Sequence, residues 1–284
     1  MSSHNLFHFN KFRPMPSLMA FWLCLTSFHA GAAPLKITIA SDSTAASFPP
    51  TDYGKRTGWG QVLSNFFDTN VVVVDLASSG RNSKSFDSEG KWAACLATHA
   101  DYYFIQFGHN DGKTQDPARY TDPETTFKGY LSNYLNQARA QGAVPVLLTP
   151  PTRRNYESEH VLKRDSLQKY AQAMREAGTN MDVPVLDVLP VSVAFYETTG
   201  KFGARVYQSN SATNTFENDT THFSAAGAEQ QCRFVVECLL HSTNSSLAPL
   251  QKGVNLRALQ LQTAPRSSGK GVDGGEGGSL MSKP

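Results

Sequence analysis

The stretch Lys36-Ile-Thr-Ile-Ala-Ser-Asp-Ser-Thr-Ala45 joins a short apolar run to a cluster of small polar residues. Runs of this kind are rich in β-branched and aromatic residues and seldom alternate cleanly with polar ones. They are typical of central strands that are covered on both faces. Five of them occur along the chain, at residues 36–41, 71–76, 102–107, 144–149 and 183–188. We therefore predict five short strands in one buried sheet.

Helical patterns fall between these runs. Apolar residues recur at helical spacing from Phe127 to Ala138, and residues 158–177 predict a second helix that ends at Gly178. Residues 225–241 predict a third helix, with Ser224 as its N-cap. Strands that alternate with helices indicate βαβ units and a mostly parallel sheet. The sequence thus predicts one three-layer α/β domain over residues 33–244, with functional groups at the carboxyl ends of the strands.

The beginning of the chain has the pattern of a secretory signal peptide. Lys11 and Arg13 precede an apolar stretch at residues 17–28, and Ala30-Gly31-Ala32 supplies small residues for cleavage after Ala32. The apolar stretch is too short to be a permanent membrane anchor. We therefore predict a signal peptide at residues 1–32 and a secreted or periplasmic protein.

The end of the chain is rich in glycine. Residues 245–284 contain seven of the 21 glycines, which predicts a disordered tail. A short docking segment at residues 254–261 is the alternative.

Composition limits the partners that the protein can have. Removing residues 1–32 takes away two of the 26 basic residues and none of the 24 acidic ones, which leaves a formal net charge of zero. Together with the lack of any Lys/Arg run, this argues against nucleic acid as a partner. Cys95, Cys232 and Cys238 remain, which allows one disulfide and a free thiol and leaves the pairing open. Cys232 lies on an apolar helical stripe and is expected to be buried.

Three predicted strands are followed by residues that can take part in chemistry. Ser43 comes just after the first strand, Gly80 after the second and Asn110 after the third. They can supply a hydroxyl, an amide that approaches a ligand closely and a side-chain amide donor. Each is also typical of an ordinary turn. No Gly-x-Ser-x-Gly elbow occurs, which argues against an ordinary α/β-hydrolase.

A carboxylate and an imidazole stand just before the last predicted helix, in Asp219-Thr-Thr-His222. On a turn, the carboxylate can accept a hydrogen bond from the imidazole, which fixes its tautomer and leaves the other nitrogen free as a base. The same spacing occurs in helix-entry turns and in pairs of metal ligands.

Together these blocks resemble the SGNH (GDSL-like) hydrolases. The Ser, Gly, Asn and His that give the family its name match Ser43, Gly80, Asn110 and His222. The resemblance covers nearly the whole predicted domain and implies a flavodoxin-like α/β/α sandwich. Its most specific pieces are Asp42-Ser43-Thr44, Gly108-His109-Asn110-Asp111 and Asp219-Thr-Thr-His222.

Within that family the sequence most resembles the rhamnogalacturonan acetylesterases. The shared features include Gly58-Trp59-Gly60 and the pattern from Ala77 to Ser83. One position departs from the family's pattern. Ser41 stands where a glycine usually precedes Asp-Ser, at a position that tightens the turn, and this bears on the geometry of the nucleophile.

The resemblance implies a mechanism with Ser43 as nucleophile, His222 as base and Asp219 as the residue that orients it. It implies an oxyanion hole formed by the backbone N–H groups of Ser43 and Gly80 and the side chain of Asn110, with no metal or organic cofactor. The expected function is that of a secreted esterase that removes acetyl groups from a plant cell-wall polysaccharide, above all rhamnogalacturonan.

Other readings of the sequence stay open. A broad lipase or arylesterase would use the same residues on its ester substrates, a glycan-binding protein could keep the fold without catalysis, and a metal-dependent lyase or hydrolase is a further alternative. Asp42 and His109 are expected to support their loops, not to catalyse. Arg153, Arg154 and Tyr156 could contact an acidic glycan or belong to a solvated loop.

Overall fold

Five parallel strands form the centre of the protein. The computed structural model describes Met1 and residues 33–52, 55–209 and 219–260. The strands lie in the order β2-β1-β3-β4-β7, and every neighbouring pair is parallel. Along the chain this order is 2-1-3-4-5, as in flavodoxin-like folds, and it confirms the predicted α/β sandwich. The bounds are β1 (Leu35–Ser41), β2 (Val71–Asp75), β3 (Tyr102–Gln106), β4 (Val144–Leu148) and β7 (Val185–Leu186).

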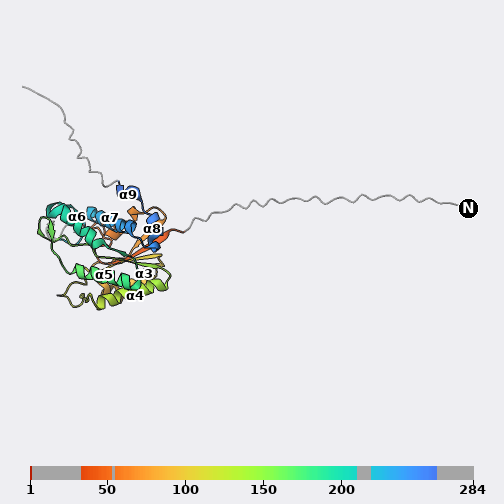
Figure 1. Cartoon of the computed structure of the whole chain (residues 1–284), viewed down its shortest axis with the longest axis horizontal. Helices are drawn as coiled ribbons and strands as arrows, with labels where there is room; N and C mark the ends of the chain where they lie inside the picture. The colour runs from red at the N-terminus through yellow and green to blue at the C-terminus, as the bar shows by residue number, and fades with distance from the viewer. Residues whose placement is uncertain (2–32, 53–54, 210–218, 261–284) are drawn as a thin grey trace, which may run out of the picture. The chain divides into compact units, whose positions relative to one another are not determined.

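Helices cover both faces of the sheet, as Figure 1 shows. Ile39 and Phe104 face one apolar cluster, while Ala40 and Ile105 face the other. Because successive residues of a strand point to opposite faces and both faces are covered, the strands read as continuous apolar runs. The first face carries α1 (Trp59–Val62), η1 (Leu63–Phe66), α6 (Val188–Gly203), α7 (Ala225–His241) and α8 (Ala248–Lys252). The second carries α2 (Ser83–Ser88), α3 (Lys91–Leu96), α4 (Thr126–Ala140) and α5 (Leu167–Met181).

Two of the predicted helices are confirmed. Helix α4 contains the apolar stripe from Phe127 to Ala138, and α7 has the predicted bounds. The Ser224 hydroxyl accepts a hydrogen bond from the Gly227 amide at 3.2 Å, which is the N-cap expected from the sequence.

The predicted helix at residues 158–177 is wrong at both ends. Its first part is instead a small hairpin of β5 (Tyr156–Ser158) and β6 (Val161–Leu162). Helix α5 begins after Asp165, whose carboxylate accepts from the Leu167 amide while its own amide donates to Gln168. This reciprocal pair resembles a capping box and is a local start signal that apolar spacing alone does not detect. The helix also continues through Gly178, which is a packing glycine because a Cβ there would overlap Val185.

Helix α6 was not predicted. The fifth predicted strand shortens to β7 because α6 begins at Val188. The hydroxyl that accepts from the Leu189 amide, at 2.9 Å, belongs to Thr149 at the end of β4. Because this amide at the start of α6 finds its acceptor on another strand, the sequence around the start of the helix carries no capping signal. The short helix η2 (Ala204–Tyr207) follows directly.

The prediction of disorder from residue 245 is wrong for the first part of that segment. Residues 245–260 form η3 (Ser245–Leu247), α8 and α9 (Leu256–Gln260). Leu247 and Leu250 are buried in the same cluster as α7, and Val254 forms a bridge with Phe67. This agrees with the alternative of a docking segment near Val254. Residues 261–284 and the predicted signal peptide lie outside the described residues, apart from Met1.

All three cysteines after the predicted leader are free. Cys95 and Cys232 are buried in apolar clusters on opposite faces of the sheet, so the sheet separates them. The burial of Cys232 is as expected from its helical stripe. In the described part of the chain, no helix is long and apolar enough to span a membrane.

The Gly58-Trp59-Gly60 motif fixes α1 against the turn that follows β1. The amides of Trp59 and Gly60 donate to the carbonyls of Thr44 and Ala45, at 3.0 and 3.1 Å. A Cβ on Gly58 would overlap backbone oxygens of this turn. The glycine therefore allows two backbone segments to touch immediately beside Ser43.

We predict that Gly58→Ala lowers the free energy of unfolding by about 3 kcal/mol, because the added methyl group meets backbone atoms that cannot rotate away. Gly129→Ala is the matched control, since Gly129 lies in α4 with open space around its Cα and alanine favours a helix by up to about 1 kcal/mol. Urea denaturation of both variants measures the difference. Equal stability of Gly58→Ala and wild type would contradict this packing.

Candidate active site

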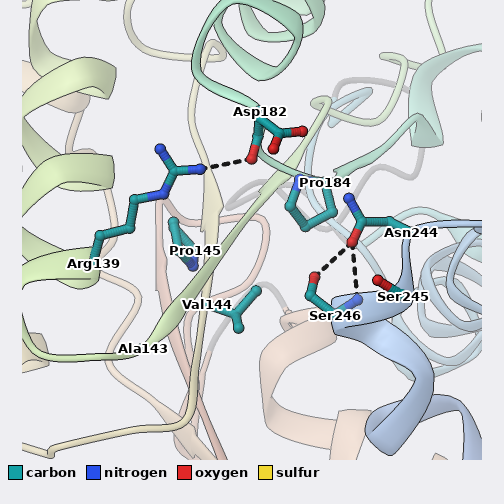
Figure 2. A pocket seen from close by; sticks show the side chains of 9 residues that line it. All are labelled: Arg139, Ala143, Val144, Pro145, Asp182, Pro184, Asn244, Ser245 and Ser246. Carbon is teal, nitrogen blue, oxygen red and sulfur yellow. Dashed lines mark hydrogen bonds between the residues drawn. The ribbon is translucent and has the colours of Figure 1, made fainter.

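The sequence-predicted residues meet at the carboxyl ends of β1, β2 and β3. Ser41 pairs with Gln106, so β1 and β3 end at the same level and bring Ser43 and Asn110 to one edge. A cavity at the opposite edge is drawn in Figure 2, where Arg139 donates to the Asp182 carbonyl at the start of the β4–β7 pair. Sites in such sheets form at the carboxyl edge. The candidate site is therefore built around Ser43.

Ser43 lies in a tight turn directly after β1. The Asp42 carbonyl accepts from the amides of Ala45 and Ala46, and the Asp42 carboxylate accepts from the amide and hydroxyl of Thr44, at 2.9 and 2.8 Å. These bonds close the turn around Ser43, whose exposed fraction is 7%. The turn thus holds the nearly buried Ser43 hydroxyl in a fixed place at the carboxyl edge of the sheet.

Ser43, His222 and Asp219 form a continuous hydrogen-bonded row. The Ser43 Oγ lies 2.8 Å from His222 Nε2. On the other side of the ring, His222 Nδ1 lies 2.9 Å from Asp219 Oδ2, and the His222 amide donates to Asp219 Oδ1 at 2.8 Å. An imidazole held in this way donates from Nδ1 to the carboxylate and presents Nε2 as an acceptor to the hydroxyl. The structure therefore joins two segments that are 179 residues apart in the sequence.

Ser209 is a further member of this row, and sequence reasoning missed it. Its hydroxyl donates to Asp219 Oδ2 at 2.8 Å. Burial alone would raise the pKa of Asp219, but the hydrogen bonds from His222 and Ser209 hold that pKa well below its usual value. The carboxylate is therefore ionised and can stabilise a positive charge on the imidazole.

Arg154 holds the His222 segment from beneath. Its guanidinium donates to the His222 carbonyl at 2.6 Å, and its amide donates to the Thr220 carbonyl at 2.8 Å. The guanidinium also lies 4.6 Å from the ring centre of Phe223, a cation–π distance. With 1% of its surface exposed, Arg154 is buried and fixes the backbone that carries His222.

This arrangement corrects the expectation that Arg154 and Tyr156 could face a glycan. Arg154 is buried, and Tyr156 is nearly so, with its hydroxyl bound to the Tyr196 carbonyl. Arg153 forms an ion pair with Asp165 and donates to the His109 carbonyl. Arg154 and Tyr156 therefore serve the interior beneath the rim, whereas Arg153 stays partly exposed.

Gly80 and Asn110 follow the two strands that flank β1. Gly80 has a φ of 78°, in the left-handed region that favours glycine. Asn110 is 4% exposed, and its Nδ2 donates to the Arg81 carbonyl at 2.9 Å. That bond links the loop after β2 to the loop after β3 and fixes the plane of the amide. Gly80 and Asn110 thus belong to two loops at the carboxyl edge that the Asn110–Arg81 hydrogen bond joins.

Asp42 and His109 form a buried pair beneath the site. Asp42 Oδ2 and His109 Nδ1 are 3.6 Å apart, and both side chains are almost fully buried. Burial opposes ionisation of Asp42, but His109 and Thr44 hold its pKa below the usual value. Burial also lowers the pKa of His109. The pair braces the turn of Ser43 against the loop of Asn110, in the supporting position expected for both.

Ser41 takes part in a second buried polar network. Its hydroxyl accepts from Gln106 Nε2 at 3.2 Å, and the same nitrogen donates to the Thr44 hydroxyl at 2.7 Å. The Trp59 indole donates to Gln106 Oε1 at 3.1 Å. The extra hydroxyl at position 41 is therefore satisfied, and its network supports the turn that carries Ser43.

The sequence left open that Asp219 and His222 are a pair of metal ligands. Among the described residues, they have no third ligand beside them. Within residues 33–52, 55–209 and 219–260, no group of three His, Cys, Asp or Glu side chains could hold a metal ion. His222 directs its second nitrogen to the Ser43 hydroxyl. The arrangement suits transfer of a proton between hydroxyl and imidazole.

Residues 42–230 match the GDSL-like Lipase/Acylhydrolase family. The chain belongs to this family. It is 35% identical over 203 residues to a "Probable rhamnogalacturonan acetylesterase" of Bacillus subtilis, covering 71% of this chain and 90% of the relative. A second rhamnogalacturonan acetylesterase of Bacillus subtilis is 34% identical over 212 residues, covering 72% of this chain and 89% of that protein.

Solved structures share the fold of this GDSL-like hydrolase. The crystal structure of the Bacillus subtilis protein YxiM superposes with a TM-score of 0.63 at 22% identity, covering 75% of this chain and 58% of that one. A catalytic mutant of an acetylxylan esterase from Geobacillus stearothermophilus superposes with a TM-score of 0.54 at 14% identity, covering 72% and 94%. At these identities the likeness concerns the fold.

We predict that Asp219→Asn destabilises this GDSL-like hydrolase in a pH-dependent way. A carboxylate whose folded pKa is depressed contributes stability above about pH 4, and that contribution is lost as the pH falls toward the folded pKa. The difference in free energy of unfolding between wild type and Asp219→Asn should therefore shrink between about pH 6 and about pH 3. Urea denaturation at several pH values measures it, with Glu157→Gln on exposed β5 as the control for loss of one carboxylate. A difference that stays constant over this range would contradict the role of the hydrogen bonds to Asp219.

Proposed function

We propose that this chain is a serine esterase in which Ser43 is the nucleophile, His222 the general base and Asp219 the residue that orients it. The observation that carries the proposal is the 2.8 Å contact between Ser43 Oγ and His222 Nε2, with Asp219 on the other side of the ring. His222 removes the hydroxyl proton as Ser43 attacks the ester carbonyl. The resulting imidazolium is stabilised by the ionised Asp219.

The negative charge that develops on the carbonyl oxygen needs donors that are already in place. The backbone N–H groups of Ser43 and Gly80 and the side-chain amide of Asn110 take this role. The bond from Asn110 to the Arg81 carbonyl supports the assignment, because it fixes the amide before substrate arrives. Preorganised donors of this kind are usually the largest single contribution to catalysis.

The remaining steps return the enzyme to its starting state. His222 gives its proton to the leaving alcohol as the bond to that oxygen breaks, which leaves an ester of Ser43. His222 then takes a proton from water, which attacks this ester, and the acid departs as the proton returns to Ser43. Every step uses side chains and backbone groups of this chain, so the mechanism requires no metal or organic cofactor.

The proposed substrate is an acetylated plant cell-wall polysaccharide, with rhamnogalacturonan as the leading candidate. The two Bacillus subtilis relatives that carry this name match about nine-tenths of their length. The predicted signal peptide would bring the enzyme to such a polymer outside the cytoplasm. A broad lipase or arylesterase and a glycan-binding protein without catalysis are the outcomes that the following experiment separates from it.

The experiment measures acetate release by wild type from acetylated rhamnogalacturonan, acetylated xylan and 4-nitrophenyl acetate. Release should be strongest from acetylated rhamnogalacturonan. Ser43→Ala should abolish release from all three, because no other group can form the acyl intermediate. Ser79→Ala is the matched control, since Ser79 is an exposed serine on the same rim. A thermal unfolding curve checks that both variants fold.

The pattern of results decides between the functions. Activity on the small ester alone would indicate a general esterase with the same catalytic residues. Binding of polymer without release from any substrate would indicate the non-catalytic protein. Full activity of Ser43→Ala would overturn the nucleophile, and loss of activity with a chelator would indicate a metal-dependent reaction.

Asn110→Ala should lower kcat by roughly a hundredfold to a thousandfold, or about 3–4 kcal/mol, with little change in KM. The reason is that the lost donor acts on charge that exists only in the transition state. Steady-state kinetics on 4-nitrophenyl acetate measures both constants. An unchanged kcat would remove Asn110 from the oxyanion hole.

A further inference from the structure

The His222 ring is bound at both of its nitrogen atoms, yet these two contacts do not fully determine its tilt. Asp219 Oδ2 lies 2.9 Å from Nδ1, and Ser43 Oγ lies 2.8 Å from Nε2. Hydrogen bonds tolerate a spread of angles, and the χ2 torsion of a histidine has only broad minima of its own. A further contact with the ring is therefore needed to align Nε2 with the Ser43 hydroxyl.

Phe48 supplies such a contact. Its ring centre lies 6.5 Å from that of His222, and the two ring planes make an angle of 84°. Edge-to-face packing is favourable for aromatic rings whose centres are about 4.5–7 Å apart. A perpendicular ring packed against the imidazole leaves it less room to tilt. No step of the proposed mechanism has used this contact.

The backbone that carries Phe48 is fixed at two points of the loop between β1 and α1. The Phe48 amide donates to Gln61 Oε1 at 3.1 Å, and Gln61 Nε2 donates back to the Phe48 carbonyl at 3.2 Å. Further along the loop, the Thr57 amide donates to the Phe223 carbonyl at 3.0 Å. The loop is thus bound to α1 and to the residue that follows His222.

The half-buried Phe48 ring is also held by a cation. The Arg56 guanidinium lies 4.3 Å from the Phe48 ring centre, a cation–π distance. Arg56 donates through Nη2 and Nε to the Asp52 carboxylate, at 2.6 and 3.1 Å. The hydrogen bond to Asp52, and further the charge of Asp219, raise the pKa of Arg56. The guanidinium is therefore fixed where it covers the ring that packs on His222.

We propose that Phe48 is a positioning residue for the general base, because its ring limits the tilt of the His222 imidazole while Arg56 holds that ring in place. The proposal rests on the proposed function, which makes His222 the base. Phe48 comes five residues after Ser43 in the sequence. The strand that carries the nucleophile therefore leads directly into the loop that aligns its base.

Steady-state kinetics on 4-nitrophenyl acetate tests this role, because a small ester brings no sugar into contact with Phe48. Phe48→Ala should lower kcat about tenfold, which corresponds to about 1.4 kcal/mol, with little change in KM. Phe48→Tyr should retain most of kcat, since it keeps the ring. Arg56→Met should lower kcat by a smaller factor, since it uncovers the ring without removing it.

Phe202→Ala is the matched control. Phe202 is an exposed phenylalanine whose ring lies 5.3 Å from the Arg205 guanidinium, so the pair imitates Phe48 and Arg56 elsewhere on the surface. Its removal should leave kcat unchanged. Thermal unfolding curves check that all variants fold, and Phe48→Leu, with a loss of kcat in the same direction, replaces Phe48→Ala if the latter does not.

Proton NMR tests the packing without turnover. The low-field resonance of the His222 Nδ1–H, assigned by its absence from His222→Gln, reports how well the ring is held against Asp219. It should broaden through faster exchange with water in Phe48→Ala and stay sharp in Phe48→Tyr and Phe202→Ala. An equally sharp resonance in Phe48→Ala would contradict the restraint on the ring.

The kinetic outcomes separate this role from its alternatives. An unchanged kcat for Phe48→Ala, or a rise in KM alone, would overturn the positioning role. A loss in Arg56→Met without one in Phe48→Ala would show that the guanidinium acts directly on Asp219 and would overturn it as well. A wild type that hydrolyses no ester would instead overturn the proposed function, and the resonance would still decide whether Phe48 orders the ring.

Discussion

The hydrogen bond between Ser43 and His222 is the contact on which the rest of the structure depends. It joins the first strand to a segment near the start of the last long helix, 179 residues away. Neither side chain is rigid by itself, and proton transfer between them requires their distance to be held constant to within a few tenths of an ångström. The fold meets this requirement by fixing the backbone at both ends of the bond. The parallel sheet supplies the first end, and the Arg154 guanidinium helps to supply the second.

The interior beneath Ser43 is polar, and this is unusual for the centre of a sheet. Ser41, Gln106 and Thr44 share one network, while Asp42 and His109 form another contact. Unpaired polar groups in such a position would cost several kcal/mol. In the first network the Gln106 amide group has partners on both sides, because its nitrogen donates to Ser41 and Thr44 and its oxygen accepts from Trp59. A hydrogen-bonded network of this kind permits fewer side-chain arrangements than an apolar core of the same size. The turn that carries Ser43 therefore rests on side chains that favour one geometry.

The sequence predicted the sheet and the polar residues that gather at its carboxyl edge because both depend on local patterns. Buried strands appear as apolar runs in the sequence. The residues that follow parallel strands lie at the carboxyl edge of the sheet, independently of the loop conformations. Helix α7 was predicted to the residue because Ser224 caps it from within its own sequence. Helix α6, the hairpin β5–β6 and the helices at residues 245–260 depend on partners elsewhere in the chain, such as Thr149 for α6. Ser209 and Arg154 were missed or misplaced for the same reason, since only the folded chain brings them to Asp219 and His222.

The helices at residues 245–260 also bear on where the domain ends. Leu247, Leu250 and Val254 close the apolar cluster beneath α7, and the Tyr102 hydroxyl donates to the Ser246 carbonyl. A chain cut at the end of α7 would uncover this cluster beside the edge strand β2, and a hydrophobic surface at a sheet edge promotes aggregation. For recombinant production, the natural place for a purification tag or a fused binding module is therefore after residue 260, beyond the helices that seal the core.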